Sequence, residues 1–72
     1  MDTGIQRAVT LAGSQFQLAE VIGVTQQAIS LWLARGWVPA ERAREIEMVF
    51  GVPRLELINP KILDMLDVSP AL

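Results

Sequence analysis

The fold is decided by residues 15–34, which read QFQLAEVIGVTQQAISLWLA. Two short helices joined by a tight turn need a small residue where they cross, and Ala19 is small. The turn itself needs a left-handed residue, a conformation that Gly23 adopts without steric cost. The positions that lock the two helices together must be apolar, and they are Leu18, Ile22, Val24, Ile29 and Trp32. This segment therefore predicts a helix-turn-helix.

Capping residues set the limits of these two helices. The side chain of Ser14 is expected to accept from the backbone N–H of Gln17 while the Gln17 side chain reaches back, which is a capping box. Gly23 ends this helix in a left-handed turn. Thr25 is a good N-cap for the second helix, which is predicted over residues 26–35.

The flanking segments predict further short helices. Residues 5–12 carry apolar side chains at helical spacing, and the helix is expected to end near Gly13. Another helix is predicted after residues 26–35, with Pro39 in its first turn and Gly51 at its end. One short helical turn is predicted over residues 53–58, and Asn59 with Pro60 can cap another. The apolar positions of the two longer helices are Ile5, Ala8, Val9, Ala12, Ala43, Ile46, Val49 and Phe50.

These elements predict an all-α fold, a compact bundle of four to five short helices with a helix-turn-helix. We expect residues 1–60 to form a helix-turn-helix DNA-binding domain. Residues 61–72 are expected to form a short C-terminal helix or tail that can serve as a dimer contact, because residues 55–66 hold more apolar surface than one small core can bury.

The composition limits the function classes. The chain has 72 residues, is 51% hydrophobic and 19% charged, and contains no Cys, His or Tyr. The usual nucleophiles, general bases and metal ligands are therefore largely missing, and no glycine-rich phosphate loop is present. No signal peptide or membrane-spanning run is evident. We expect a cytoplasmic, nucleoid-associated protein that is not an enzyme and takes no cofactor, metal or small-molecule ligand.

The net charge of −2 argues against DNA binding, which relies on Lys and Arg at the phosphates. The charges are unevenly distributed, however. Residues 1–44 carry a net charge of +1, whereas residues 45–72 carry −3. Most of the acidic excess therefore lies outside the predicted DNA-binding segment.

The segments 15–19 and 23–32, QFQLA and GVTQQAISLW, resemble the lambda-repressor-like family of phage and bacterial regulators. The segments 35–43, 51–53 and 57–60, RGWVPAERA, GVP and LINP, are similar to its Cro and YdaS-type subgroup. The resemblance covers about residues 4–62. It implies a Cro-like repressor of phage or prophage type that binds a double-stranded DNA operator. The apolar excess of residues 55–66 predicts that it binds as a homodimer.

The resemblance also implies which residues face the major groove. Helical geometry agrees, because a helix that turns Ile29, Trp32 and Leu33 inward presents its opposite side outward. Glutamine can pair with adenine N6 and N7, serine with several bases, and leucine with a thymine methyl. The expected base contacts, within residues 26–34, are Gln26, Gln27, Ser30, Leu31 and Ala34.

Phosphate contacts are expected beside this face. The resemblance implies that Gln15, at the start of the first of the two helices, contacts a phosphate next to Gln26. The backbone amides there would assist. The full set of expected phosphate contacts is Gln15, Thr25, Arg35, Arg7 and Arg42.

Other interpretations remain open. The polar residues of this helix could form a merely solvated face, and Leu31 or Leu33 could belong to a protein interface. The corresponding alternative function is an antitoxin or adaptor, a protein-interaction module with a helix-turn-helix scaffold and little DNA affinity. Trp37 is expected to anchor its loop over the following helix.

Overall fold

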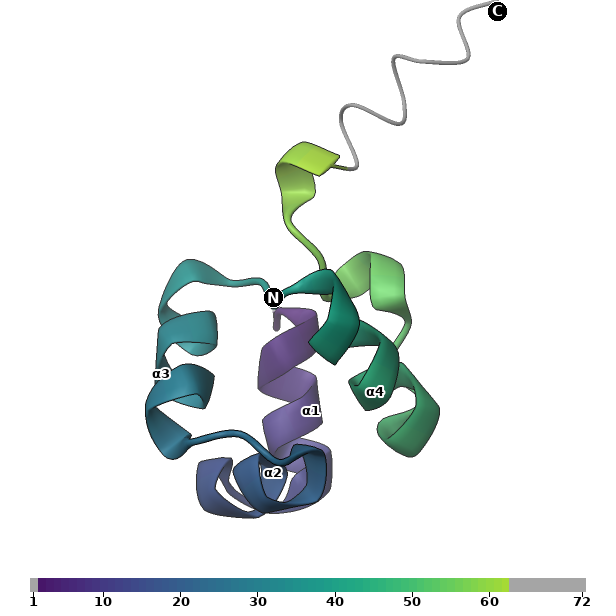
Figure 1. The fold of residues 1–72 in the computed structure, drawn as a ribbon. Coiled ribbons are helices and arrows are strands. Elements are labelled where there is room, and N and C mark those ends of the chain that lie inside the picture. The colour runs from purple at the N-terminus through teal and green to yellow at the C-terminus, as the bar shows by residue number, and fades with distance from the viewer. Residues whose placement is uncertain (1, 63–72) are drawn as a thin grey trace, which may run out of the picture.

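The computed structural model describes residues 2–62, and its regular elements are all helical. They are α1 (Gly4–Ala12), α2 (Gln15–Ile22), α3 (Gln26–Arg35), α4 (Ala40–Phe50) and the short 3-10 helix η1 (Arg54–Glu56) (Figure 1). A further helical turn starts at Pro60, where the side chain of Asn59 accepts from the N–H of Lys61 at 2.9 Å. The predicted all-α bundle of four to five short helices is confirmed.

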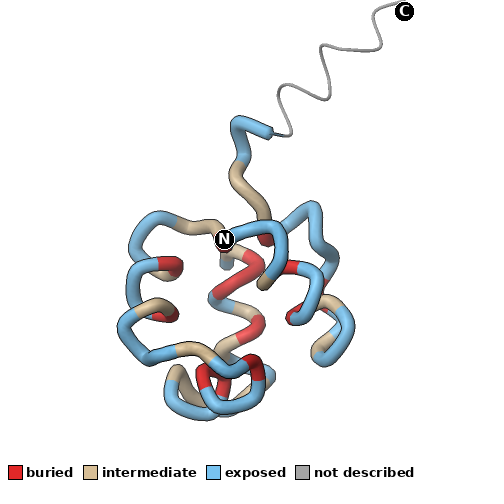
Figure 2. Tube along the Cα trace, viewed as in Figure 1, coloured by how far each residue is buried: buried red, intermediate tan, exposed pale blue. Residues whose placement is uncertain are grey.

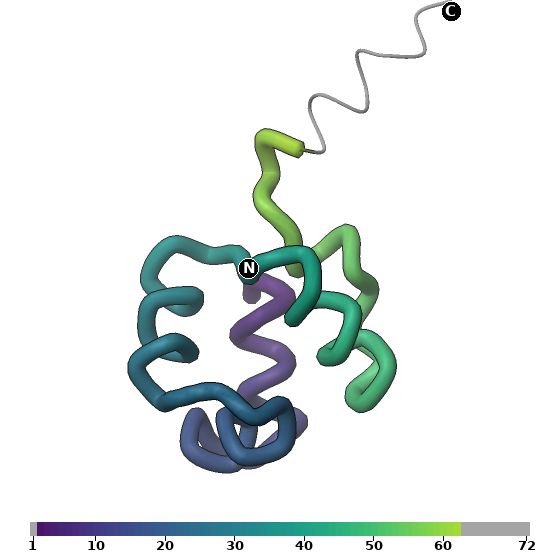
Figure 3. Tube along the Cα trace, in the orientation of Figure 1, coloured from purple at the N-terminus to yellow at the C-terminus, as the bar shows by residue number. Residues whose placement is uncertain are grey.

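Helix α1 occupies the middle of the bundle and contacts α2, α3 and α4. Helices α3 and α4 lie on either side of it, and α2 crosses one end (Figure 1). The other end of α1 approaches the loop that follows α3 (Figure 3). Thr3 lies next to Gly36 there. The buried segments face this centre (Figure 2). The core consists of Ile5, Ala8, Leu18, Ala19, Ile22, Ile29, Trp32, Val38, Ala43, Ile46, Val52 and Leu57.

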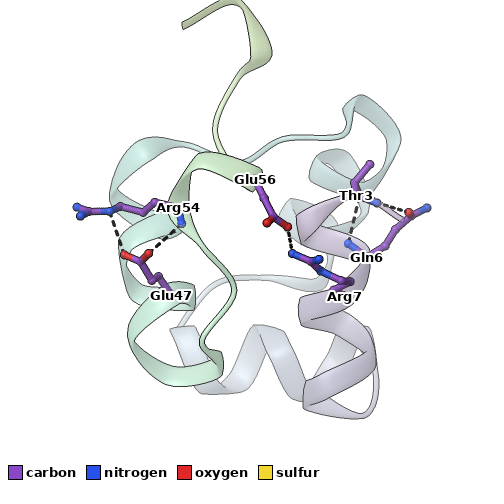
Figure 4. A network of polar contacts seen from close by, with 6 residues as sticks. All are labelled: Thr3, Gln6, Arg7, Glu47, Arg54 and Glu56. Atoms are coloured by element: carbon purple, nitrogen blue, oxygen red, sulfur yellow. Dashed lines mark hydrogen bonds and ion pairs between the residues drawn. The ribbon is translucent and has the colours of Figure 1, made fainter. Parts of the chain in front are cut away.

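The predicted caps of α2 and α3 agree with the structure except at Ser14. Its hydroxyl accepts from the Gln17 N–H at 3.1 Å, as predicted. The Gln17 side chain does not reach back to the Ser14 backbone, because its amide oxygen lies 3.4 Å from the Ser14 hydroxyl instead. The predicted capping box is therefore wrong in its second half. A complete one occurs in α1, where Thr3 and Gln6 exchange both hydrogen bonds (Figure 4).

Two details of α4 differ from the prediction. Pro39 is the N-cap, so the helix begins one residue later, at Ala40. Val49 is 57% exposed, although its spacing from Ile46 predicted burial. The cause is that Val49 lies beside Val21 at a shallow hollow between α2 and α4, outside the stripe of α4 that packs into the core.

The segment after α4 is hydrogen-bonded to the loop that precedes α4. Leu57 is fully buried, and its carbonyl accepts from the N–H of Val38 at 2.7 Å. Lys61 and Ile62 are exposed. The predicted dimer contact of residues 61–72 falls almost wholly on residues 63–72, which lie outside the described residues. None of the helices in the described part of the chain is long and apolar enough to cross a membrane.

Candidate nucleic-acid interface

The turn between α2 and α3 has the geometry that the sequence predicted. Gly23 adopts the left-handed conformation, with φ 74° and ψ 37°. The N–H of Val24 donates to the carbonyl of Ala19 at 3.0 Å, and the Thr25 hydroxyl caps α3 by accepting from the Ala28 N–H at 3.1 Å. The small side chain of Ala19 is buried where α2 meets α3. The two helices thus form a helix-turn-helix.

Helix α3 has one buried side and one exposed side. Ile29 and Trp32 are buried, and Leu33 packs partly buried against the core. Leu31 is 55% exposed, so of the two leucines beside Trp32 it is the one turned outward. The structure places all the predicted base-contact residues on the exposed side: Gln26, Gln27, Ser30, Leu31 and Ala34.

A hydrogen bond joins the start of α2 to this exposed side. The hydroxyl of Ser30 donates to Oε1 of Gln15 at 3.1 Å. The proton of Ser30 is therefore directed at α2, which leaves the lone pairs of its oxygen for a donor outside the protein. The amide nitrogen of Gln15 retains its donors at the same edge. The sequence does not predict this contact, because Gln15 and Ser30 are fifteen residues apart and meet only through the packing of α2 against α3.

Two of the predicted phosphate-contact arginines are paired within the protein. Arg7 forms an ion pair with Glu56 of η1 (Figure 4). Arg42 pairs with Glu45 at 2.9 Å and also donates to the carbonyl of Ile22 at 3.4 Å. Both side chains are half-buried, and their guanidinium groups already have acceptors. Glu56 is far from Arg7 in sequence, so charge counting could not reveal that pair.

Arg35 has a different environment. It is exposed at the end of α3, and the structure records no carboxylate partner for it within residues 2–62. Its guanidinium carbon lies 3.6 Å from the centre of the Trp37 ring, and its Nε donates to the Trp37 carbonyl at 3.2 Å. The fully buried side chain of this loop is Val38, whereas Trp37 is half-buried. The loop is therefore anchored by Val38, and Trp37 supports an arginine.

The remaining predicted residue, Thr25, is exposed at the start of α3 next to Gln26. The exposed edge of α3 is thus continuous from Thr25 to Arg35 and carries amides, hydroxyls, one leucine and one cation. Within residues 2–62 no group of acidic side chains is arranged to hold a metal ion, and no polar side chain is buried. The exposed amides and hydroxyls of this edge can form hydrogen bonds with an extended partner.

Comparisons with known proteins agree with this geometry. A family model described as bacterial toxin YdaS matches residues 5–58, which include the whole helix-turn-helix. The Gene 30 protein of Enterobacteria phage phi80 is 42% identical over 62 residues, which cover 83% of this chain and 84% of that protein. The solved structure of the Cro protein from the putative prophage element Xfaso 1 in Xylella fastidiosa strain Ann-1 is 47% identical, with a TM-score of 0.72. The match covers 76% of this chain and 88% of that one.

Proposed function

The chain belongs to the YdaS family, and from this premise we propose that it is a sequence-specific regulator that binds double-stranded DNA. The observation that carries the proposal is the exposed, largely uncharged side of α3 behind a tight left-handed turn. A helix in this position enters the major groove in helix-turn-helix proteins. The similarity to a prophage Cro protein and to a phage protein supports a Cro-like repressor of phage or prophage type.

In this proposal the exposed residues of α3, its N-cap and the start of α2 divide between bases and phosphates. Gln26 and Gln27 offer amides that match adenine N6 and N7, and Leu31 offers an apolar contact for a thymine methyl. Ala34 permits close approach of the helix to the groove. Thr25, Gln15 and Arg35 contact phosphates and set the orientation of the helix. Arg7 and Arg42 contribute less to the electrostatic attraction of DNA, because the carboxylates of Glu56 and Glu45 offset their positive charges.

The protein is proposed to act as a homodimer, because a helix with one cation needs a second copy to gain affinity. Two recognition helices would then enter major grooves about 34 Å apart. Exposed apolar side chains such as Met48 and Leu55 supply surface that a partner copy could cover. Such a regulator acts on the nucleoid in the cytoplasm, without a cofactor or a catalytic step.

The direct test is retention of labelled duplexes from the protein's own locus, at low salt and then across a salt titration. The proposal expects binding that weakens steeply with ionic strength and a protected region with two half-sites one helical turn apart. The alternative is an antitoxin or adaptor that contacts a protein through an apolar surface around Leu31, an interpretation that the net charge of −2 favours. Absence of retention at low salt would exclude the regulator and leave this alternative.

Replacing Gln27 by alanine is expected to weaken binding to the preferred site by about 1–3 kcal/mol while changing binding to random DNA little, because a base-edge contact is lost. Arg35→Ala is the matched contrast. It should weaken binding to both duplexes alike and reduce the slope of log affinity against log salt by about 1. Fluorescence anisotropy with the two duplexes measures both effects. Equal losses on both duplexes for Gln27→Ala would contradict its base contact.

Replacing Gln15 by alanine is expected to relax the choice of base opposite Ser30. The Ser30 hydroxyl, which donates to Gln15, accepts from the groove and so favours an amino group, adenine N6 or cytosine N4. Without Gln15 the hydroxyl can also donate, and the preference should fall by about 1 kcal/mol. Competition among duplexes that differ at single bases measures this change. Gln17→Ala, in the same helix, is the control, and unchanged preferences in Gln15→Ala would refute the role of the pair.

A further inference from the structure

We propose that Trp37 is a positioning residue for Arg35, and that the two side chains form a preset phosphate-binding unit at the C-terminal end of α3. The inference rests on the proposed function and deepens it. The structural basis is the stacking of the Arg35 guanidinium over the Trp37 ring at 3.6 Å, together with the hydrogen bond from Nε to the Trp37 carbonyl at 3.2 Å. Trp37 therefore holds Arg35 at two points.

The stacked arrangement leaves the phosphate-binding edge of the arginine available. A guanidinium group has five N–H donors, and the Trp37 carbonyl takes the one on Nε. Stacking occupies a face of the group, so the four N–H donors of the two terminal nitrogens stay at its edge. Phosphate oxygens accept from such an edge in pairs. Support by the ring and binding of a phosphate are thus compatible.

The backbone at Trp37 is fixed on both sides. Before it, the N–H of Gly36 donates to the carbonyl of Trp32 at 2.7 Å, and Gly36 ends α3 with a left-handed φ of 87°. After it, Val38 is buried, and its N–H donates a hydrogen bond to the carbonyl of Leu57. A long arginine side chain usually loses much conformational freedom when it binds, and a fixed support reduces that loss.

Arg35 is also the arginine whose charge this protein leaves most available near α3. Arg7 and Arg42 have carboxylate partners in Glu56 and Glu45. Arg35 has an aromatic face instead, which retains the full positive charge of the guanidinium. In a chain of net charge −2, one well-placed cation per recognition helix makes a large share of the phosphate contacts.

The test compares Trp37→Leu with Trp37→Phe, in the wild-type and Arg35→Ala backgrounds. Both replacements are apolar, but only phenylalanine keeps an aromatic face. Trp37→Leu should weaken binding about two- to fivefold on the preferred duplex and on random DNA alike, and should reduce the salt slope. Trp37→Phe should retain most of the affinity and the slope. In the Arg35→Ala background neither replacement should have a further effect, and thermal unfolding of each variant checks that the fold is kept.

The other outcomes separate the inference from the proposed function. Tighter binding by Trp37→Leu would show that the ring withholds Arg35 from DNA, which overturns the inference. An equal loss with and without Arg35 would show that Trp37 acts by another route, and wild-type affinity in Trp37→Leu would show that it has no role. Each of these results leaves DNA binding intact. A wild-type chain that binds no duplex at low salt overturns the proposed function and this inference together.

Discussion

Replacing Trp32 by alanine is expected to lower the free energy of unfolding by about 3–5 kcal/mol. The side chain is 5% exposed and belongs to the core that α3 shares with α1 and α2. Its removal leaves a large cavity that short helices can close only by losing their packing. Because a domain of this size has a total stability near the lower end of about 5–15 kcal/mol, the variant should retain only about 0–2 kcal/mol of it. Urea denaturation followed by far-ultraviolet circular dichroism measures the loss.

The neighbouring residue provides the control. Leu31 is 55% exposed on the solvent side of the same helix, and Leu31→Ala should change stability by less than about 0.5 kcal/mol. It should nevertheless weaken binding to the preferred duplex, because the thymine-methyl contact is lost. A denaturation midpoint near that of the wild type for Trp32→Ala would mean that α3 is not held by this side chain, and the orientation of its exposed face would have to be revised.

Replacing Gly4 by alanine is expected to destabilise the protein by about 1–3 kcal/mol, the cost of overpacking. In an exposed helix the same change usually stabilises by up to about 1 kcal/mol. Gly4 is buried at the start of α1, where an added Cβ would lie 2.5 Å from the carbonyl oxygen of Glu56 and 3.1 Å from a methyl carbon of Leu57. Helix α1 would therefore have to move away from η1.

Thermal unfolding measures this effect, since 1 kcal/mol shifts the midpoint by roughly 4–8 °C in a domain of this size. Thr10→Ala is a suitable control, because Thr10 is an exposed residue of the same helix. Comparison of Gly4→Ala with Thr10→Ala distinguishes the effect of close packing against η1 from the effect of helix propensity. A raised midpoint in Gly4→Ala would indicate that η1 does not pack against α1 as described.

The sequence predicted the helix-turn-helix well because its determinants are local. Gly23 and Thr25 act on residues within one turn of themselves, and Ala19 lies only four residues before the turn, so their spacing predicts both the caps and the crossing. The exposed side of α3 followed from the same periodicity. The capping box of Thr3 and Gln6 has an equally local signature, and it was missed although the spacing was present.

The predictions that failed or stayed incomplete depend on contacts between distant segments. Val49 has the spacing of a core residue, but its exposure depends on how α4 packs beside α2. The partner of Arg7 is Glu56, at the other end of the described chain. Arg35 and Trp37 are close in sequence, yet their stacking depends on the left-handed turn at Gly36 and on the burial of Val38. Residue spacing contains none of this information.

The hydrogen bond from Val38 to Leu57 has a consequence for the local stability of the loop after α3. Most surface loops open by small fluctuations that leave the rest of the protein folded. The Val38 N–H donates to the carbonyl of the buried Leu57, so it becomes accessible to water only when the segment of η1 and Leu57 separates from this loop. Leu57 then leaves the core as well. Hydrogen exchange at that amide is therefore tied to unfolding of the core. We therefore expect the Val38 amide to exchange as slowly as amides of the core helices, although it lies in a loop.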